Sequence, residues 1–199
     1  MIRVAREGDL WIVTLDRADK ANALTADMLT ELIGIYKIAG GAKAVILTGE
    51  GTVFSAGADL DEAPKGLAKS PLWEELSSAI AAAPGLTVAA LNGTLAGGAF
   101  GMALACDLRV AVPGAKFFYP VMKMGFLPQP SDPGRLKALV GPSRAKLLLM
   151  AGQKWTADQA LDAGLVDGVF DDVMPVARDL CAAALSAEHS HVGAIKALI

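Results

Sequence analysis

The feature that most constrains this chain is the stretch from Leu76 to Cys106, which contains no Asp, Glu, Lys or Arg. A stretch of this length could cross a lipid bilayer, for which a helix needs about 20 predominantly apolar residues. Pro84-Gly85, Asn92-Gly93 and Gly97-Gly98 divide it into pieces that are each too short to span. The stretch therefore predicts buried strands and helices of a globular core, and we expect no membrane partner.

The composition favours the same kind of core. The chain has 199 residues, of which 53% are hydrophobic and 20% charged, so it can bury a large core and is unlike a disordered protein. A formal net charge of -3 gives no basic surface for nucleic acid, which we exclude as a partner. The N-terminal residues lack the apolar segment of a signal peptide, and two cysteines make no disulfide framework. We therefore expect a cytoplasmic protein.

Apolar runs and helical patterns alternate along the chain, which predicts an α/β fold with mostly parallel strands in a single domain of residues 1–199. Thr25 is placed to cap the first helix. Strands are expected at Ile2–Val4, Leu10–Leu15, Ala44–Thr48, Val53–Ser55, Leu86–Leu91, Leu108–Val112, Lys116–Tyr119 and Val166–Phe170. Helices are expected at Thr25–Ile38, at Trp73–Ala82, at Ala96–Ala105 and over most of the chain after Pro133.

Two glycine-rich segments follow predicted strands and are the first candidates for chemistry. They are Phe54–Leu60 and Asn92–Phe100. Glycines between a strand and a helix leave free backbone N–H groups at the helix N-terminus, which favours an anion or a developing oxyanion. Two such turns could direct two donors at one carbonyl oxygen, and one well-placed donor lowers a barrier by roughly 3 kcal/mol. The same glycines could also form plain turns, so this pattern alone leaves the function open.

Other glycine-containing motifs fit poorly. Neither a G-x-G-x-x-G nor a G-x-x-x-x-G-K-[ST] spacing occurs. The segment around Ser55 is similar to a nucleophile elbow, but Val53 stands where its first glycine belongs. The histidines that could serve Ser55 are His189 and His191, in a polar stretch where we expect exposed surface. A hydrolase with Ser55 as nucleophile is therefore a weaker alternative.

Together, the two glycine-rich segments resemble the two signatures of the enoyl-CoA hydratase/isomerase (crotonase) superfamily. The first signature is Val53–Leu60, and the second is Asn92–Ala99 with Ala105–Asp107. Three further segments are similar to the family's CoA loop, to the region past its second active-site strand and to a later helix-turn: Asp16–Leu24, Pro120–Leu136 and Ala157–Val166. The resemblance runs nearly from end to end, with its segments in the family's order.

The resemblance implies a fold and a reaction centre. The fold would be a crotonase-like spiral of ββα units, and the substrate an acyl-CoA thioester, with no cofactor besides the coenzyme A that the substrate carries. The N–H groups of Ala58 and Gly98 would hold the thioester oxygen as it becomes an enolate oxygen. Gly57 and Gly97, being small, would permit the substrate and the backbone to approach closely.

The resemblance also implies contacts to coenzyme A and an assembly. The carbonyl of Ala56 would meet the adenine, and the backbone at Lys20 and Ala21 would contact the CoA, with the Lys20 ammonium available for its phosphates. Family members form trimers that stack into hexamers, so we expect a homo-oligomer. The sequence stops at Ile199, before the family's terminal helices, so we expect an open cavity or a cover from a partner subunit.

The sequence departs from the family where hydratases carry two glutamates. Gly101 stands at the first position and Val121, directly after Pro120, at the second. Neither can transfer a proton, and such help is worth about 10²–10⁴-fold, so ordinary hydration should be severely impaired. Other members place an Asp at the position of Gln129, and the nearest carboxylate here is Asp132. Asp132 fits a helix cap, with a displaced acid or base as its other candidate role.

Three functions follow from these observations, in descending order of support. The first is an acyl-CoA enzyme that stabilises an enolate with the two amides and uses a displaced base such as Asp132. The second is a non-catalytic acyl-CoA-binding protein or a partner subunit of an enzyme. The third is the hydrolase with Ser55.

Overall fold

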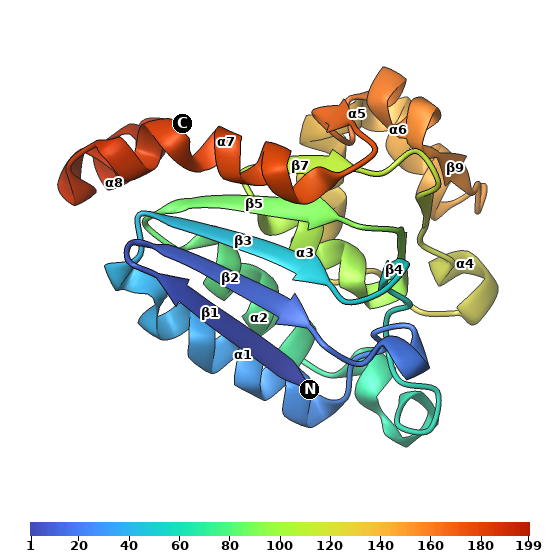
Figure 1. Ribbon diagram of the computed structural model, residues 1–199. Helices are drawn as coiled ribbons and strands as arrows, with labels where there is room; N and C mark the ends of the chain where they lie inside the picture. Colours follow the sequence, from blue (N-terminus) through green and yellow to red (C-terminus); the bar gives the residue numbers. More distant parts are fainter.

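A six-stranded sheet forms the centre of the protein in the computed structural model, which describes residues 1–199 (Figure 1). Its strands lie in the order β1-β2-β3-β5-β7-β10. The β1–β2 hairpin is antiparallel, and every other neighbouring pair is parallel, as the sequence predicted. The strand bounds are β1 Ile2–Glu7, β2 Leu10–Leu15, β3 Ala44–Gly49, β5 Leu86–Leu91, β7 Leu108–Ala111 and β10 Gly168–Val169.

A second, smaller sheet has the order β4-β6-β8-β9. Its strands are β4 Val53–Ser55, β6 Thr94–Ala96, β8 Lys116–Phe118 and β9 Trp155–Thr156. Each of β4, β6 and β8 follows a strand of the large sheet and is followed in turn by a helix, α2, α3 or α4. This repeat of strand, strand and helix confirms the crotonase-like spiral of ββα units.

The helices vary widely in length. Their bounds are α1 Ala26–Ile38, α2 Leu72–Ala81, α3 Phe100–Ala105, α4 Val121–Met124, α5 Asp132–Leu149, α6 Ala157–Ala163, α7 Val173–Ser186 and α8 His189–Lys196. Short 3-10 helices occupy η1 Ala18–Lys20, η2 Ala39–Gly41, η3 Ala63–Lys65, η4 Leu67–Lys69 and η5 Gly97–Ala99. The α5 axis is kinked at Gly141, which has a positive φ and precedes Pro142.

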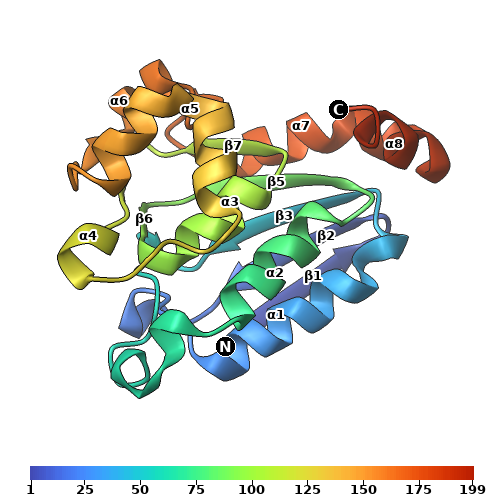
Figure 2. The same ribbon diagram turned by 180° about the vertical axis from the view of Figure 1, so that it is seen from behind.

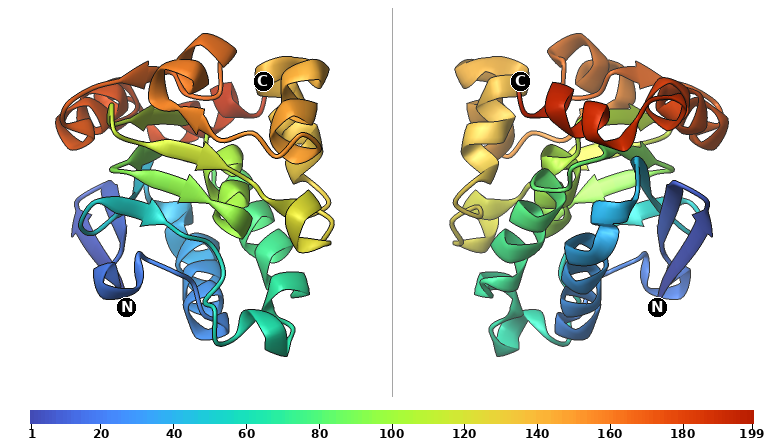
Figure 3. Two further views of the ribbon diagram at one scale, coloured as in Figure 1. Left: turned by 90° about the vertical axis from the view of Figure 1, so that its right-hand side faces the viewer. Right: turned by 90° about the vertical axis from the view of Figure 1, so that its left-hand side faces the viewer.

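Helices cover both faces of the large sheet, which explains why its inner strands are apolar at nearly every position. Alternate residues of β2 divide between the faces. Trp11 and Val13 belong to the cluster that includes α1 and α2, whereas Leu10 and Ile12 pack with residues of α7. Figure 2 shows α1 and α2 in front of the sheet, and Figure 3 shows the sheet between these helices and α7.

The first helix begins where the sequence predicted. The Oγ1 atom of Thr25 accepts a hydrogen bond from the N–H of Met28 at 3.2 Å, which satisfies one of the free donors of the first turn. A second donor is satisfied from outside the helix, because a carboxylate oxygen of Glu62 accepts from the N–H of Ala26 at 2.9 Å. Glu62 therefore ties the segment after the first glycine-rich turn to α1.

The stretch without charged residues folds as core elements, and no helix of the protein is long and apolar enough to cross a membrane. β5 confirms the predicted strand at Leu86–Leu91. The helix predicted from Ala96 is wrong at its start, because Thr94–Ala96 pairs with the small sheet and α3 begins only at Phe100. The two-residue β9 and the four-residue α4 were not predicted, since neither is long enough to show a periodic pattern.

Candidate active site

Three neighbouring strands of the small sheet end at the same place. β4, β6 and β8 are parallel to one another, with Ser55 paired to Leu95 and Ala96 paired to Phe118. The residues that follow them must therefore lie side by side, although they are far apart in the sequence. These residues are Ala56–Asp59 after β4, Gly97–Ala99 after β6 and Tyr119–Pro120 after β8.

The two glycine-rich turns touch through their backbones. Gly57 has a φ of +94°, and a Cβ atom on it would lie 2.9 Å from the carbonyl oxygen of Ala96 and 3.3 Å from the nitrogen of Gly98. A Cβ atom on Gly97, which has a φ of +57°, would lie 3.6 Å from the carbonyl oxygen of Ala56. Any larger residue at 57 would push the turns apart, so glycine is required there by contact as well as by conformation.

This arrangement leaves the two predicted donors near one another. The N–H of Ala58 has no acceptor within the chain. Gly98 lies in the first turn at the start of η5 and α3, where N–H groups lack intrahelical acceptors. The ring of Trp73 closes the other side of this turn, because a Cβ atom on Gly98 would lie 3.1 Å from it. Ala58 and Gly98 are thus presented on a packed, rigid backbone.

A cavity of about 160 Å³ lies against these turns. Eleven of its fifteen lining residues are hydrophobic, so it suits an apolar group with a polar end directed at the backbone amides. The lining residues are Ala56, Ala58, Leu60, Ala63, Ala68, Trp73, Gly97, Gly98, Tyr119, Pro120, Val121, Met124, Phe126, Leu127 and Gln129. The predicted residues Ala56, Ala58, Gly97 and Gly98 are therefore brought together on one wall.

The segment predicted to meet CoA runs alongside the first turn. The N–H of Ala56 donates to the carbonyl of Ala21 at 3.0 Å, and the N–H of Leu24 donates to the carbonyl of Gly57 at 2.8 Å. Ala21 has a φ of +51°, which is uncommon for a residue with a side chain. Lys20 ends η1 and is exposed, so its ammonium is free to meet a ligand.

A buried ion pair fixes this segment to the first turn. The guanidinium of Arg17 donates to a carboxylate oxygen of Asp59 at 2.7 Å and to the carbonyl of Ala23 at 2.9 Å. The Arg17 guanidinium holds the pKa of the Asp59 carboxyl below its usual value, with further help from the N–H of Asp61. The charged form of Asp59 is therefore the one that the fold selects.

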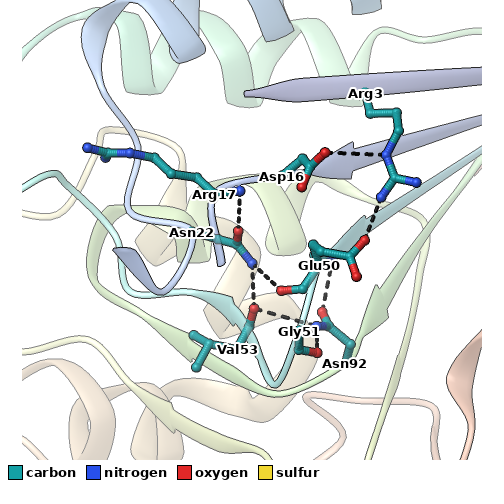
Figure 4. Close-up of polar contacts among 9 residues, drawn as sticks. Arg3, Asp16, Arg17, Asn22, Glu50, Gly51, Val53 and Asn92 are labelled. Carbon is teal, nitrogen blue, oxygen red and sulfur yellow. Dashed lines mark hydrogen bonds and ion pairs between the residues drawn. The ribbon is translucent and has the colours of Figure 1, made fainter. Parts of the chain in front are cut away.

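Two asparagines hold the connection between the two sheets (Figure 4). The Nδ2 atom of Asn22 donates to the carbonyls of Glu50 and Val53, at 2.9 and 2.7 Å. The Nδ2 atom of Asn92 donates to the carbonyl of Gly51 at 2.9 Å. These bonds link the segment before α1 and the end of β5 to the entrance of β4, and so they position the first turn.

Ser55 has a structural part in this arrangement. It is fully buried, its Oγ atom donates to the carbonyl of Asn22 at 2.8 Å, and the same atom accepts from the N–H of Gly57 at 3.2 Å. The half-buried His189 and the exposed His191 lie on α8, at the other end of the large sheet from β4 (Figure 1). The geometry argues against Ser55 as a nucleophile, because no base is within reach of it.

The prediction that Asp132 caps a helix is wrong. Ser131 is the N-cap residue of α5, and Asp132 is the first helical residue, with no side-chain bond to the helix backbone. The side chain turns into the core instead, where it is 1% exposed and accepts a hydrogen bond from the hydroxyl of Tyr119 at 2.8 Å. Burial raises the pKa of Asp132 to about 7. Asp132 is a buried carboxyl that is poised to change charge near neutral pH.

The positions of the two missing glutamates have different surroundings. Gly101 lies in the buried helix α3, and a Cβ atom on it would lie 3.0 Å from the Oδ1 atom of Asp132. Val121 begins α4 and lines the cavity with its neighbour Pro120. Gln129 also lines the cavity, as an uncharged amide. The carboxylate nearest to Gly101 thus comes from a different helix.

Sequence reasoning missed Tyr119. It ends the β8 segment directly before Pro120, lines the cavity and stacks on Phe100 with ring centroids 5.3 Å apart. Its position directly before the resembling segment that begins at Pro120 was the available signal, but an aromatic residue at the end of a strand is ordinarily assigned to the core. Its bond to Asp132 depends on α5, which the sequence does not place.

Comparisons with known proteins show which family shares this sequence and fold. The family model described as Enoyl-CoA hydratase/isomerase matches residues 5–199. The chain is 34% identical over 195 residues to the probable enoyl-CoA hydratase echA6 of Mycobacterium tuberculosis, covering 96% of this chain and 80% of that protein. It is 35% identical over 200 residues to the 4-chlorobenzoyl coenzyme A dehalogenase-2 of an Arthrobacter species, covering 92% and 72%.

A solved structure extends the likeness to the whole fold. A Thermobifida fusca protein of the enoyl-CoA hydratase type, solved in complex with CoA, superposes with a TM-score of 0.89 at 27% identity, covering 99% of this chain and 83% of that one. The chain belongs to the enoyl-CoA hydratase/isomerase family.

Proposed function

We propose that this protein is an acyl-CoA-processing enzyme in which the N–H groups of Ala58 and Gly98 hold the thioester oxygen while it carries enolate charge. The observation that carries the proposal is the backbone contact between the two glycine-rich turns at one wall of the cavity. Fixed backbone donors stabilise a developing oxyanion without reorganising during the reaction, and each is worth roughly 3 kcal/mol. The side chains at these positions contribute by being small.

The cavity suits the remainder of such a substrate. Its hydrophobic lining would exclude water from the acyl group and strengthen the bonds to the thioester oxygen. The relatives named as a hydratase and a coenzyme A dehalogenase, together with the structure solved with CoA, support a CoA thioester as the ligand.

The CoA would extend from the amides toward the segment before α1. Ala56 lines the cavity, and its N–H bonds to the carbonyl of Ala21, which supports a path of the CoA along this segment. The carbonyl of Ala56 would meet the adenine, and the backbone at Lys20 and Ala21 would contact the CoA. The exposed ammonium of Lys20 would lie near the phosphates, where opposite charge gives a modest, salt-sensitive contribution. Coenzyme A is part of the substrate here, and the chemistry proposed needs no separate cofactor.

The experiment that tests the proposal has two readouts. Calorimetry with butyryl-CoA measures binding, and mass spectrometry of butyryl-CoA incubated with enzyme in D₂O measures exchange of the protons next to the thioester. This exchange is the simplest reaction that an enolate-stabilising site performs, and it requires no knowledge of the natural acyl group. Binding with exchange is the expected result. Absence of binding to butyryl-CoA and to crotonyl-, malonyl- and benzoyl-CoA would contradict the proposal.

A second candidate function is a non-catalytic acyl-CoA-binding protein or a partner subunit. Gly101 and Val121 favour it, because neither can transfer a proton from the positions at which hydratases hold their glutamates. Binding of CoA thioesters without exchange or turnover would select this candidate.

The assembly is a related proposal. A homo-oligomer, trimeric or hexameric, would place neighbouring subunits over the exposed side chains of Leu60 and Leu127 at the cavity. Light scattering coupled to size exclusion measures the assembly directly, and a monomer at assay concentration would refute it.

A further inference from the structure

Tyr119 and Asp132 form a hydrogen-bonded pair at the cavity, and only Tyr119 lines it. Tyr119 lines the cavity, and its hydroxyl donates to the Oδ2 atom of Asp132 at 2.8 Å. Asp132 is 1% exposed and does not line the cavity. The other carboxylate oxygen, Oδ1, is buried and has no hydrogen-bond partner. A buried carboxyl with one unsatisfied oxygen is costly, which makes Asp132 a candidate for a functional role.

The carboxyl occupies space that a side chain at position 101 would need. A Cβ atom on Gly101 would lie 3.0 Å from Oδ1 and 3.4 Å from Oδ2 of Asp132, which is tighter than ordinary contact. The helix α3 that carries Gly101 begins directly after the Gly98 turn. Glycine at 101 therefore lets the carboxyl of Asp132 pack directly against α3, the helix that begins at the Gly98 turn.

The charged groups around Asp132 come from two helices. Glu74 on α2 faces it and disfavours its ionised form, while Arg135 on α5 favours that form. Both are otherwise engaged: Glu74 accepts from the N–H and the hydroxyl of Ser131, and Arg135 donates to the hydroxyl of Ser77. Neither makes a hydrogen bond to Asp132, so the Tyr119 hydroxyl is the one side-chain group that is hydrogen-bonded to its carboxyl.

We propose that Tyr119 and Asp132 form the proton-transfer pair of the cavity, with Tyr119 as the catalytic residue and Asp132 as the positioning residue that stores the proton behind it. The inference rests on the proposed function, because the amides of Ala58 and Gly98 must hold the resulting enolate. It supplies from β8 and α5 the proton transfer that Gly101 and Val121 cannot perform.

The step balances with no other reactant. The C–H bond next to the thioester breaks, and its proton forms a new O–H bond on Tyr119 Oη while the original hydroxyl proton passes to Asp132 Oδ2. The electron pair of the C–H bond becomes the enolate, whose oxygen is held by the two amides. Burial and the neighbouring carboxylate raise the pKa of Tyr119 well above its usual value, so both protons move together and no free phenolate forms. The reverse movement returns a proton to carbon, and carbon gains a deuteron when the Tyr119 hydroxyl has first exchanged its proton with D₂O in the cavity.

Exchange of butyryl-CoA protons in D₂O tests the pair through Tyr119→Phe, Asp132→Asn and the double variant. Tyr119→Phe keeps the ring that stacks on Phe100, and Asp132→Asn keeps an oxygen that can accept the Tyr119 hydroxyl. We expect each single variant to lose about 10²–10⁴-fold in exchange rate, with a Kd for butyryl-CoA within about twofold of the parent. The double variant should be within about tenfold of the worse single one, since residues that act as a unit are not additive.

Two further measurements separate proton transfer from a structural role. In the parent the exchange rate should rise with pH and level off above about 7, as the carboxylate forms, and Asp132→Asn should abolish this rise. Tyr36→Phe is the matched control, because Tyr36 is the other tyrosine of the chain, and its buried hydroxyl has no hydrogen-bond partner. It should leave the exchange rate and its pH dependence unchanged.

The outcomes distinguish this inference from the function beneath it. If butyryl-CoA and the other thioesters do not bind, both fail. If the parent binds but does not exchange, the pair is refuted and the non-catalytic candidate is selected. If the parent exchanges and folded Tyr119→Phe exchanges equally fast, the pair alone is refuted. Equal losses at every pH, accompanied by weaker binding, would assign both residues a structural role and also overturn the inference.

Discussion

The two sides of the cavity are built by different means. The amide side consists of main-chain N–H groups at Ala58 and Gly98, which the register of β4 and β6 places next to one another. The proton-transfer side consists of side chains: Tyr119, which directly follows β8 and lines the cavity, and Asp132 in the first turn of α5, which is hydrogen-bonded to Tyr119 and does not itself line the cavity. A main-chain site tolerates many side chains as long as they are small, whereas a side-chain site depends on particular atoms. The first therefore depends on packing and the second on the chemistry of individual side chains.

Replacing Asp132 with Asn should change the pH dependence of stability most. Burial raises the pKa of Asp132 from 3.8 to about 7, so between these values the folded protein binds a proton that the unfolded chain has released. The free energy of unfolding of the parent should therefore fall, relative to Asp132→Asn, as pH rises from about 4 to above 7. The full difference is roughly 4 kcal/mol, measured by urea denaturation at several pH values.

The hydroxyl of Tyr119 offers a check on that result. Its hydrogen bond lowers the pKa of Asp132, so removing it in Tyr119→Phe should move the fall in stability to higher pH. A parent and an Asp132→Asn variant with parallel stability curves would show that Asp132 is not a buried titrating group.

Gly57→Ala should break the amide side. Its Cβ atom would meet the carbonyl oxygen of Ala96 at 2.9 Å and the nitrogen of Gly98 at 3.3 Å, so the turns must separate. Loss of one aligned donor should cost roughly 3 kcal/mol in the barrier, or about 10²–10³-fold in butyryl-CoA exchange. The control is Gly8→Ala in the β1–β2 turn, where φ is +62° but no atom lies within 4 Å. If Gly57→Ala exchanges as fast as Gly8→Ala, the close contact between the two turns is not needed for the exchange.

Gly101→Ala tests whether the carboxyl of Asp132 needs the space that glycine leaves at position 101. The added methyl would lie 3.0 Å from Oδ1 of Asp132 and displace the carboxyl, at a cost of about 1–3 kcal/mol in stability. It should also slow the exchange more than it weakens binding. Gly34→Ala on the exposed face of α1 meets no atom within 4 Å and should stabilise by up to about 1 kcal/mol. In thermal unfolding, the Tm should fall for Gly101→Ala and rise for Gly34→Ala.

Lys20→Ala should have the smallest effect. An exposed lysine near phosphates contributes less than about 1 kcal/mol, so the Kd for butyryl-CoA should rise a few-fold at low salt and converge with the parent at high salt. The affinity for a butyryl-pantetheine thioester, which has no nucleotide phosphates, should not change. Lys116→Ala, on β8, is the control. A loss of pantetheine affinity would place Lys20 elsewhere in the site.

The main-chain donors and the side-chain pair also differ in how far the sequence could predict them. The apolar runs of β3 and β5 and the glycines at 57, 97 and 98 are local signals, because strands and tight turns are specified by adjacent residues. The spiral and the two amides were predicted from them together with the family resemblance. The register that brings β4 and β6 into contact joins residues about forty positions apart, and the structure was needed to show it.

The Tyr119–Asp132 pair could not be predicted from such local signals. Asp132 has the sequence context of a helix cap, and only the packing of α5 against α3 turns its side chain inward. The local preference of Asp132 for a capping position was overridden by tertiary contacts. Its carboxyl bonds to Tyr119, thirteen residues earlier, and packs against Gly101. A carboxylate that arrives from a different helix cannot be found by aligning positions along the chain.

The path of the chain between β4 and β6 separates two properties that an enzyme usually has to change together. Strand register fixes the spacing of the amides, while the excursion through η3 and η4 supplies Leu60, Ala63 and Ala68 to the cavity wall. The side chains at 60, 63 and 68 can therefore change in bulk, and so alter which acyl chain would fit, while Glu62 and the carbonyl of Leu67 keep the segment attached to α1 and to Trp73. Under the proposed function, the choice of acyl group would therefore depend on side chains that can be replaced separately from the two amides.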